Sequence, residues 1–164
     1  MHDAVVREVD GDADIEEVRR LVRAHGDARS TTPGVEYVYA DAARMPGPYS
    51  PPDGGIWIAV VDGHVCGCVA LRPLHAGTAE VKRMFVDAQY RGRGLGRALL
   101  ESLIEGARAR GYATLRLGTL DDMLAAQALY HSLGFTRVDR YRQDELIDTR
   151  FYELRLADRT PRQM

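Results

Sequence analysis

Two spacings of apolar residues alternate along the chain, and together they predict a mixed α/β layout around one sheet. Alternate or short continuous apolar runs are typical of strands, whereas apolar residues three and four positions apart are typical of helices. The first pattern predicts strands at residues 4–9, 56–61, 65–71, 79–86, 114–117, 136–141 and 150–156. The second predicts helices at residues 14–26, 35–44, 95–110 and 123–133. The length favours a single domain over residues 1–164.

Local signals at the ends of these elements sharpen the prediction. Asp14, with Glu17 three residues later, predicts the N-cap of the first helix. The pair Asp62-Gly63 is typical of a tight hairpin turn between two strands. The proline- and glycine-rich residues 45–55 predict a loop at the rim of the domain.

The strongest functional signal is the glycine-rich run at residues 91–96, between a predicted strand and a predicted helix. Glycine at positions 92, 94 and 96 removes every Cβ from one side of the turn, so backbone N–H groups can approach a ligand closely. Because a helix N-terminus attracts anions, this run predicts a phosphate site. Three basic side chains, Arg91, Arg93 and Arg97, add positive charge around it.

Two common phosphate-binding loops do not match this run. The dinucleotide fingerprint needs a third small residue where Arg97 or Leu99 stands, and no Gly-Lys-Ser/Thr follows the turn. A glycine-rich turn with solvated arginines is the alternative. The strand before it and the helix after it favour the anion site.

Composition excludes several classes of protein. A hydrophobic content of 45%, a charged content of 28% and a net charge of −2 are those of a globular protein without a basic nucleic-acid-binding surface. No signal peptide or membrane-spanning run is evident, so a cytoplasmic protein is expected. Cys66 and Cys68 fall on the same face of a predicted strand. Since a metal site needs more ligands, they are interpreted as buried thiols, with no metal expected.

Three separated motifs resemble those of the GNAT superfamily of acyl-CoA-dependent N-acyltransferases. They are the R-x-x-G-x-G loop at Arg91, Gly94 and Gly96, the strand Glu80 to Val86 before it, and an L-Y-x-x-L-G-F segment at residues 129–135. Residues 45–74 also resemble a bacterial subgroup. The resemblance implies a central mixed, mostly antiparallel sheet flanked by helices. Two residues depart from the pattern, since Met123 replaces a cofactor-contacting asparagine and Gly118 a common aspartate.

The resemblance implies acetyl-CoA as cofactor and places it residue by residue. The pyrophosphate is expected on the N–H groups of the glycine loop, and the pantetheine arm along the preceding strand, like an added strand. A backbone N–H of this strand is expected to face the thioester carbonyl. The implied cofactor-binding residues are Met84, Phe85, Val86, Arg91, Gly92, Arg93, Gly94, Leu95, Gly96, Arg97 and Ala126.

Two residues are candidates for proton transfer. Tyr130 is the candidate general acid, because a phenol is protonated at neutral pH and can donate to a leaving thiolate. Its alternative is a packing role in the core. Glu80, a carboxylate on an apolar strand, is the candidate general base for the incoming amine. A salt bridge with a nearby lysine or arginine is an equal alternative.

The acceptor site is less well defined by sequence. Arg72 and Arg83 lie on neighbouring predicted strands, and a bulge would turn Arg83 to the face of Glu80. If either arginine faces the acceptor pocket, it would suit a substrate with a carboxylate. Solvated arginines are the alternative. Tyr49, in a stretch with Tyr37, Tyr39 and Trp57, predicts a lidded pocket.

These features predict an N-acetyltransferase that acts on a small primary amine, such as an amino acid. A non-catalytic acyl-CoA sensor and a protein lysine or N-terminal acetyltransferase are the alternatives. No nucleic acid or membrane partner is expected. Relatives are often dimeric, so a homodimer is an open expectation.

Overall fold

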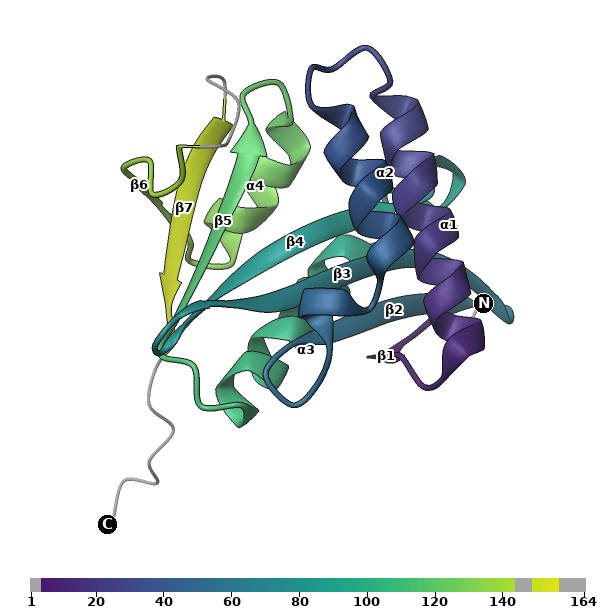
Figure 1. Ribbon diagram of the computed structural model, residues 1–164, viewed down its shortest axis with the longest axis horizontal. Coiled ribbons are helices and arrows are strands. Elements are labelled where there is room, and N and C mark those ends of the chain that lie inside the picture. Colours follow the sequence, from purple (N-terminus) through teal and green to yellow (C-terminus); the bar gives the residue numbers. More distant parts are fainter. Residues whose placement is uncertain (1–3, 144–148, 157–164) are drawn as a thin grey trace.

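Seven strands form one sheet in the computed structural model, which describes residues 4–143 and 149–156 (Figure 1). The strands are β1 (Ala4–Glu8), β2 (Gly55–Val61), β3 (His64–His75), β4 (Thr78–Val86), β5 (Thr114–Leu120), β6 (Thr136–Val138) and β7 (Thr149–Arg155). The helices are α1 (Asp12–Ala28), α2 (Val35–Arg44), α3 (Leu95–Ala109) and α4 (Leu124–Ser132), with short 3₁₀ turns η1 (Gly47–Tyr49) and η2 (Ala88–Tyr90). The predicted order of strands and helices is confirmed, although β3 is longer and β6 shorter than expected.

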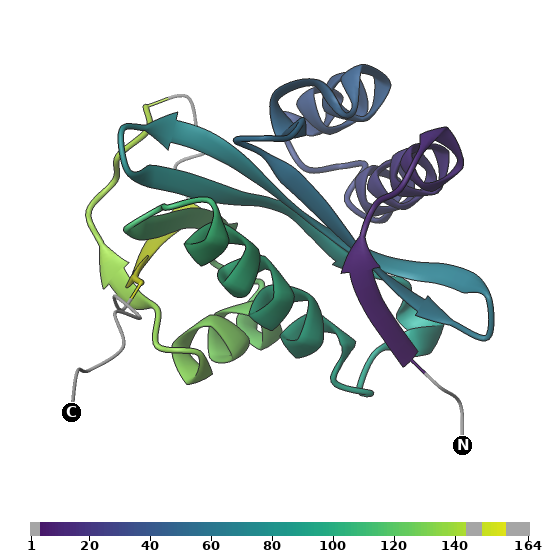
Figure 2. The same ribbon diagram turned by 90° about the horizontal axis from the view of Figure 1, so that it is seen from below.

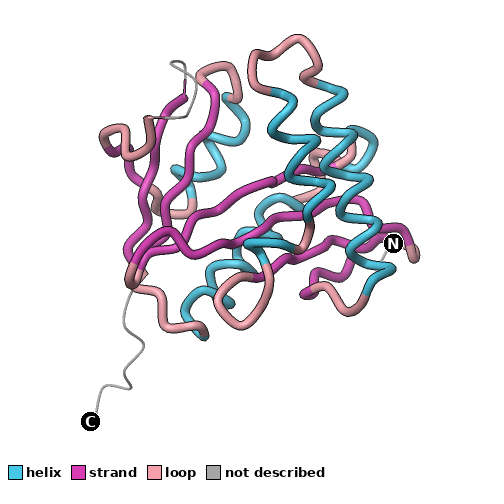
Figure 3. Tube along the Cα trace, in the orientation of Figure 1, coloured by secondary structure: helices cyan, strands magenta, loops and turns pink. Residues whose placement is uncertain are grey.

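The sheet is mixed but mostly antiparallel, as the resemblance implies. Its order is β1-β2-β3-β4-β5-β7-β6, and only β4 and β5 run parallel. These two strands pair only from Thr78–Glu80 to Thr114–Arg116, whereas β4 continues to Val86 and β5 to Leu120. Beyond Glu80 the sheet therefore opens between β4 and β5, a separation visible in Figures 1 and 3.

Helices cover both faces of the sheet. Figure 2 shows α1 and α2 on one face and α3 and α4 on the other. Each face has its own apolar core. Under α1 and α2 the core includes Val18, Leu21 and Ile58, and against α3 it includes Leu99 and Leu103.

The start of α1 differs from the prediction. The helix begins at Asp12 with Gly11 as its N-cap, and no side chain caps it. Asp14 lies inside the first turn, where its carboxylate accepts hydrogen bonds from the Asp10 backbone N–H and the Arg7 guanidinium, both at 2.6 Å. The prediction of Asp14 as N-cap is wrong, because its carboxylate is instead bonded to Arg7 on β1.

A bulge in β3 separates the two cysteines. Gly67 lies opposite Ala59 and Val65 opposite Val60, so Cys66 is an extra residue in its strand. An extra residue reverses the faces to which the flanking side chains point. Cys66 packs in the core on the α3 face and Cys68 in the core under α1 and α2. The prediction that they share a face is wrong, whereas their burial as free thiols is confirmed.

A second bulge, in β4, confirms the expectation for Arg83. Cys68 lies opposite Phe85 and Ala70 opposite Lys82, so β4 has one residue more than β3 between these pairs. Arg83 adopts a positive φ of 56°, uncommon for a residue with a side chain. The bulge turns Arg83 toward Asp41 of α2, on the face where Arg72 and Glu80 are paired.

The predicted lid of aromatic residues does not form. Tyr49 is 1% exposed and packs in the core under α1 and α2, and its hydroxyl donates to Asp41 at 2.7 Å. Trp57 packs in the core on the opposite face, while Tyr37 is 70% exposed. The four aromatic residues are separated because strand alternation and helix position, rather than sequence proximity, decide where each points. Contrary to the prediction, Tyr49 is therefore buried in a core and does not point into a substrate pocket.

Candidate active site

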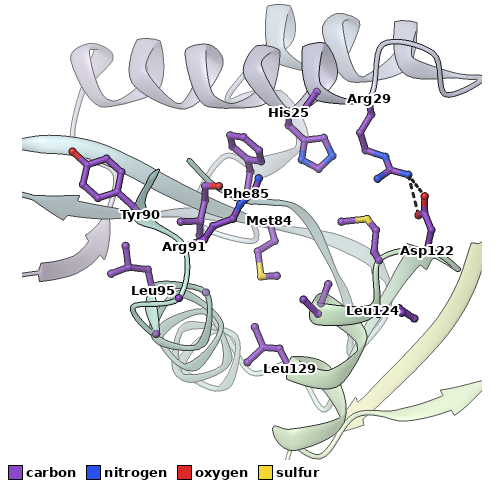
Figure 4. A pocket seen from close by; sticks show the side chains of 18 residues that line it. His25, Arg29, Met84, Phe85, Tyr90, Arg91, Leu95, Asp122, Leu124 and Leu129 are labelled. Carbon is purple, nitrogen blue, oxygen red and sulfur yellow. Dashed lines mark hydrogen bonds and ion pairs between the residues drawn. The ribbon is translucent and has the colours of Figure 1, made fainter. Parts of the chain in front are cut away.

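A cavity of about 620 Å³ lies where β4 and β5 separate (Figure 4). It is bounded by the end of α1, the second half of β4, the glycine loop with the start of α3, and α4. Its wall includes these predicted cofactor residues: Met84, Phe85, Val86, Arg91, Gly92, Gly94, Leu95, Gly96 and Ala126. The structure therefore brings most of the predicted cofactor residues to one place.

The β4 side of the cavity offers backbone groups. No described residue of β5 pairs with β4 beyond Glu80, so from there to Val86 this edge of β4 has no partner strand from β5. An extended ligand can bond to such an edge as an added strand does. On the α4 side, Leu124 is 70% exposed at the cavity wall and provides apolar surface.

The glycine loop forms the end of the cavity at α3. Gly92 has a φ of 77° and Gly94, the N-cap of α3, a φ of 79°, and both conformations favour glycine. No side chain caps this helix start. The first N–H groups of α3 are therefore available to an anion at the cavity.

The three arginines of the loop have different positions. Arg91 lines the cavity, donates from Nε to the Val86 carbonyl at 2.9 Å and lies over the Phe85 ring. Arg93 lies over the Tyr90 ring. Arg97 binds Glu101 and the Ser132 hydroxyl, and so connects α3 to α4. Neither Arg93 nor Arg97 is in the cavity wall, so charge contributed by them would act from a distance.

Tyr130 lies on α4 beside the cavity-lining Leu129. Its side chain is 6% exposed and packs near Phe135 and Tyr152, with ring centroids 5.8 and 6.2 Å away. Among the described residues its hydroxyl has no hydrogen-bond partner, and Tyr130 is not in the cavity wall. Burial raises the pKa of Tyr130, which keeps the phenol protonated and able to donate.

Glu80 lies where β4 and β5 part, and its carboxylate is already bonded. Its Oε1 accepts from Arg72 Nη2 at 2.7 Å and Arg142 Nη1 at 2.8 Å, and its Oε2 accepts from the Tyr141 hydroxyl at 2.7 Å. Burial alone would raise the pKa of Glu80, but the charge of Lys82 and the bonds from Tyr141 and Arg72 outweigh it and lower the pKa. The predicted salt bridge is therefore present, and the base role stays a prediction.

Arg83, Asp41 and Tyr49 form a second polar group on the same face. Asp41 Oδ2 accepts from both Arg83 Nε and the Tyr49 hydroxyl, each at 2.7 Å. Burial opposes ionisation of Asp41, but these two bonds outweigh it and lower the pKa of its carboxyl. Neither Arg72 nor Arg83 is in the cavity wall. Arg83 is nevertheless close enough for its charge to lower the pKa of His25, which does line the cavity.

Residues from α1 and the loop before α4 complete the cavity, and the sequence did not single them out. His25 of α1 and Arg29, the residue after this helix, line it, and Arg29 Nη2 donates to both carboxylate oxygens of Asp122 at 3.0 and 3.2 Å. Figure 4 shows this ion pair beside the inward-pointing imidazole of His25. A signal existed, because His25 and Arg29 continue the i, i+3, i+4 apolar stripe of α1 through Val18 and Val22.

Residues 17–135 match the acetyltransferase (GNAT) family, and the chain therefore belongs to this family. Its members are acyltransferases whose acyl donor is acetyl-CoA. Human N-acetylaspartate synthetase is 40% identical over 119 residues, which cover 71% of this chain and 37% of that protein. The chain thus spans little more than a third of this relative's length.

Solved structures show the same fold. An acetyltransferase of the GNAT family from Staphylococcus aureus Mu50 has a TM-score of 0.81 at 23% identity, covering 94% of this chain and all (100%) of the other. A putative acetyltransferase from Salmonella typhimurium, solved with its cofactor acetyl-CoA, has a TM-score of 0.70 at 23% identity and 95% coverage of both chains.

The cavity suits acetyl-CoA in three respects. The open β4 edge matches the amide groups of an extended pantetheine arm, and the uncapped start of α3 matches a pyrophosphate. The exposed Leu124 gives the arm apolar contact. When bound, the cofactor supplies the acetyl group as a thioester.

None of the described helices is long and apolar enough to cross a membrane. The expectations of a bacterial source, a cytoplasmic location and a homodimer stay predictions. The matched relatives include vertebrate proteins such as the human one.

Proposed function

We propose that this protein acetylates the primary amine of a small molecule that also carries a carboxylate, such as an amino acid. The observation that carries the proposal is the charge of the cavity. Arg29 and Arg91 line it, and the one acidic side chain in the described part of its wall, Asp122, is already paired with Arg29. A carboxylate on the acceptor would add negative charge beside these arginines and beside Arg83, whose charge also acts on His25 in the cavity.

The name of the human relative agrees with this substrate class, because aspartate is an amine with carboxylates. Arg72 and Arg83 support it from the adjacent face of the sheet, where Glu80 and Asp41 hold them in place. Because each carboxylate engages only part of a guanidinium, N–H groups of Arg72 and Arg83 are left for a substrate.

Three parts of the site divide the work in this proposal. The β4 edge and the start of α3 hold the cofactor, and a β4 N–H stabilises the developing oxyanion. Tyr130 donates a proton to the leaving thiolate. Glu80 fixes the arginines through its ion pairs, and its action as a base remains the alternative.

The test is an acceptor screen with acetyl-CoA that measures free thiol. Aspartate, glutamate and glycine should be turned over with higher kcat/KM than their amides or simple alkylamines. Equal turnover of the neutral analogues would contradict the proposal that the enzyme recognises a carboxylate on the acceptor. Coenzyme A binding without thiol release from any amine would indicate a sensor, and turnover of peptides alone would indicate a protein acetyltransferase.

Charge-conserving variants test the arginines without leaving Asp41 or Glu80 unpaired. Arg83→Lys and Arg72→Lys keep the charge but lose the fork of donors, so the acceptor KM should rise about 10–150-fold, as for one lost charged hydrogen bond of about 1.5–3 kcal/mol. Coenzyme A affinity should stay near that of the wild type. Arg108→Lys is the matched control, since Arg108 pairs with Glu105 on α3.

A further inference from the structure

His25 is the side chain in the cavity that the proposed function leaves without a role. It extends from the last turns of α1, and Figure 4 shows its imidazole pointing into the cavity between Phe85 and the Arg29–Asp122 pair. The ring packs edge-on against Phe85, with centroids 5.2 Å apart, which fixes its orientation. Its nitrogens have no hydrogen-bond partner among the residues that the structure describes.

Acetyl transfer to an amine needs a group that takes a proton from nitrogen. Within the described wall of the cavity, the side chains that can exchange protons near neutral pH or accept them are His25, Tyr90 and Asp122. Both oxygens of Asp122 accept from Arg29. Tyr90 carries a phenol hydroxyl, a much weaker proton acceptor than an imidazole nitrogen, and the Arg93 guanidinium lies over its ring. His25 therefore has the one basic side-chain atom of this wall that is still available.

We propose that His25 accepts the proton that the acceptor amine releases during acetyl transfer. The amine nitrogen bonds to the acetyl carbon as the carbon–sulfur bond breaks, and the bonding electrons leave with sulfur. The proton lost from nitrogen passes to an imidazole nitrogen of His25 and from there to solvent through the open cavity. This inference rests on the proposed function and adds the identity of its base.

The surroundings of His25 determine its protonation state before the acceptor binds. Burial, together with the positive charges of Arg83 on β4, Arg29 after α1 and Arg91 before α3, lowers the pKa of His25 to about 4. The imidazole is therefore neutral at physiological pH, and until negative charge is added beside it, it is a weaker base than an unperturbed imidazole. The same guanidinium charges oppose an ammonium in the cavity, which favours the neutral, reactive amine. A bound carboxylate would offset part of the charge and strengthen the base when the acceptor is present.

The test compares His25→Gln with the wild type. Glutamine keeps polarity and similar size but cannot take a proton, so kcat should fall about 10²–10⁴-fold near neutral pH, with unchanged coenzyme A affinity by calorimetry. The deficit in kcat relative to the wild type should become smaller as pH rises toward 8–10, about the pKa range of amino groups, because solvent then removes the proton. Added imidazole should partly restore activity to His25→Ala. His64→Gln, in the exposed β2–β3 hairpin, is the matched control.

A readout without turnover separates the base from a packing role. In an NMR titration of the protein without cofactor, the His25 ring should stay neutral well below pH 6.5, and aspartate should raise its pKa. Wild-type turnover with an equal rate in His25→Gln, or a pH-independent deficit without imidazole rescue, would overturn the inference and leave the proposed function standing. Failure of the wild type with every amine would instead overturn the proposed function.

Discussion

The two sides of the cavity are built in different ways. The cofactor side consists of neighbouring residues, from β4 through the glycine loop to α3, and offers mainly backbone N–H and C=O groups. The proposed acceptor side consists of side chains from distant segments: in the wall, Arg29 is bonded to Asp122, 93 residues away, and outside the wall, Arg83 is bonded to Asp41, 42 residues away. In the proposed function, backbone conformation therefore controls binding of the cofactor, whereas individual side chains control binding of the acceptor and the proton transfers.

The largest effect on turnover should come from removing a single oxygen atom, the hydroxyl of Tyr130. Tyr130→Phe removes the proposed acid but keeps the ring between Phe135 and Tyr152, so kcat should fall about 10²–10⁴-fold with unchanged coenzyme A affinity. Tyr112→Phe is the control, because Tyr112 donates to the Asp53 carbonyl beyond the C-terminus of α3. Normal turnover in a folded Tyr130→Phe protein would assign Tyr130 to the core.

A backbone change should be the most damaging one on the cofactor side. Gly94→Val forces a branched side chain into a φ of 79° and distorts the start of α3, so coenzyme A affinity should fall about 10–100-fold, as for strain of about 1–3 kcal/mol. Gly111→Val is a matched control at the other end of α3. Gly111 has a φ of 85°, and neither glycine has an atom within 4 Å of an added Cβ.

Calorimetry on both glycine variants shows whether the loss of coenzyme A affinity is specific to the start of α3. If Gly111→Val weakens coenzyme A as much as Gly94→Val does, general loss of stability explains the effect. The assignment of the α3 start to the cofactor would then be contradicted.

The smallest effect is expected from a charged side chain beside the cofactor side. Arg97→Ala removes exposed bonds to Glu101 and Ser132, so stability should change by about 0–1 kcal/mol and coenzyme A affinity by less than about threefold. Arg91→Ala should weaken coenzyme A about tenfold, because Arg91 lines the cavity and supports the end of β4. A larger loss in Arg97→Ala than in Arg91→Ala would show that side-chain charge outweighs backbone on this side.

The sequence predicted well those features that neighbouring residues decide. Asp62 and Gly63 both have positive φ in the hairpin turn, as the pair of residue types indicates. The glycine loop opens α3 at Leu95, as the spacing of Gly92 and Gly94 indicates. These conformations depend on local sterics, which the identity of a few adjacent residues determines.

Other features depended on how the elements pack, and sequence alone could not decide them. A bulge in β3 moved Cys66 to the face opposite Cys68, and Asp14 bonded to Arg7 instead of capping its helix. Instead of forming a lid, Tyr49 and Trp57 pack in two different cores, and Tyr37 is exposed. Each outcome was decided by a partner across the sheet or on another helix, which apolar spacing does not reveal.

By itself, the sequence determined the order of strands and helices and the glycine turn that begins α3, because adjacent residues fix local backbone geometry. Only the tertiary structure decided that β4 and β5 separate after Glu80, that Glu80 is bonded to Arg72 and Arg142, and that His25 points into the cavity. These arrangements join segments far apart in the chain. Their energies come from burial and charge pairing that exist only once the sheet and its helices have assembled.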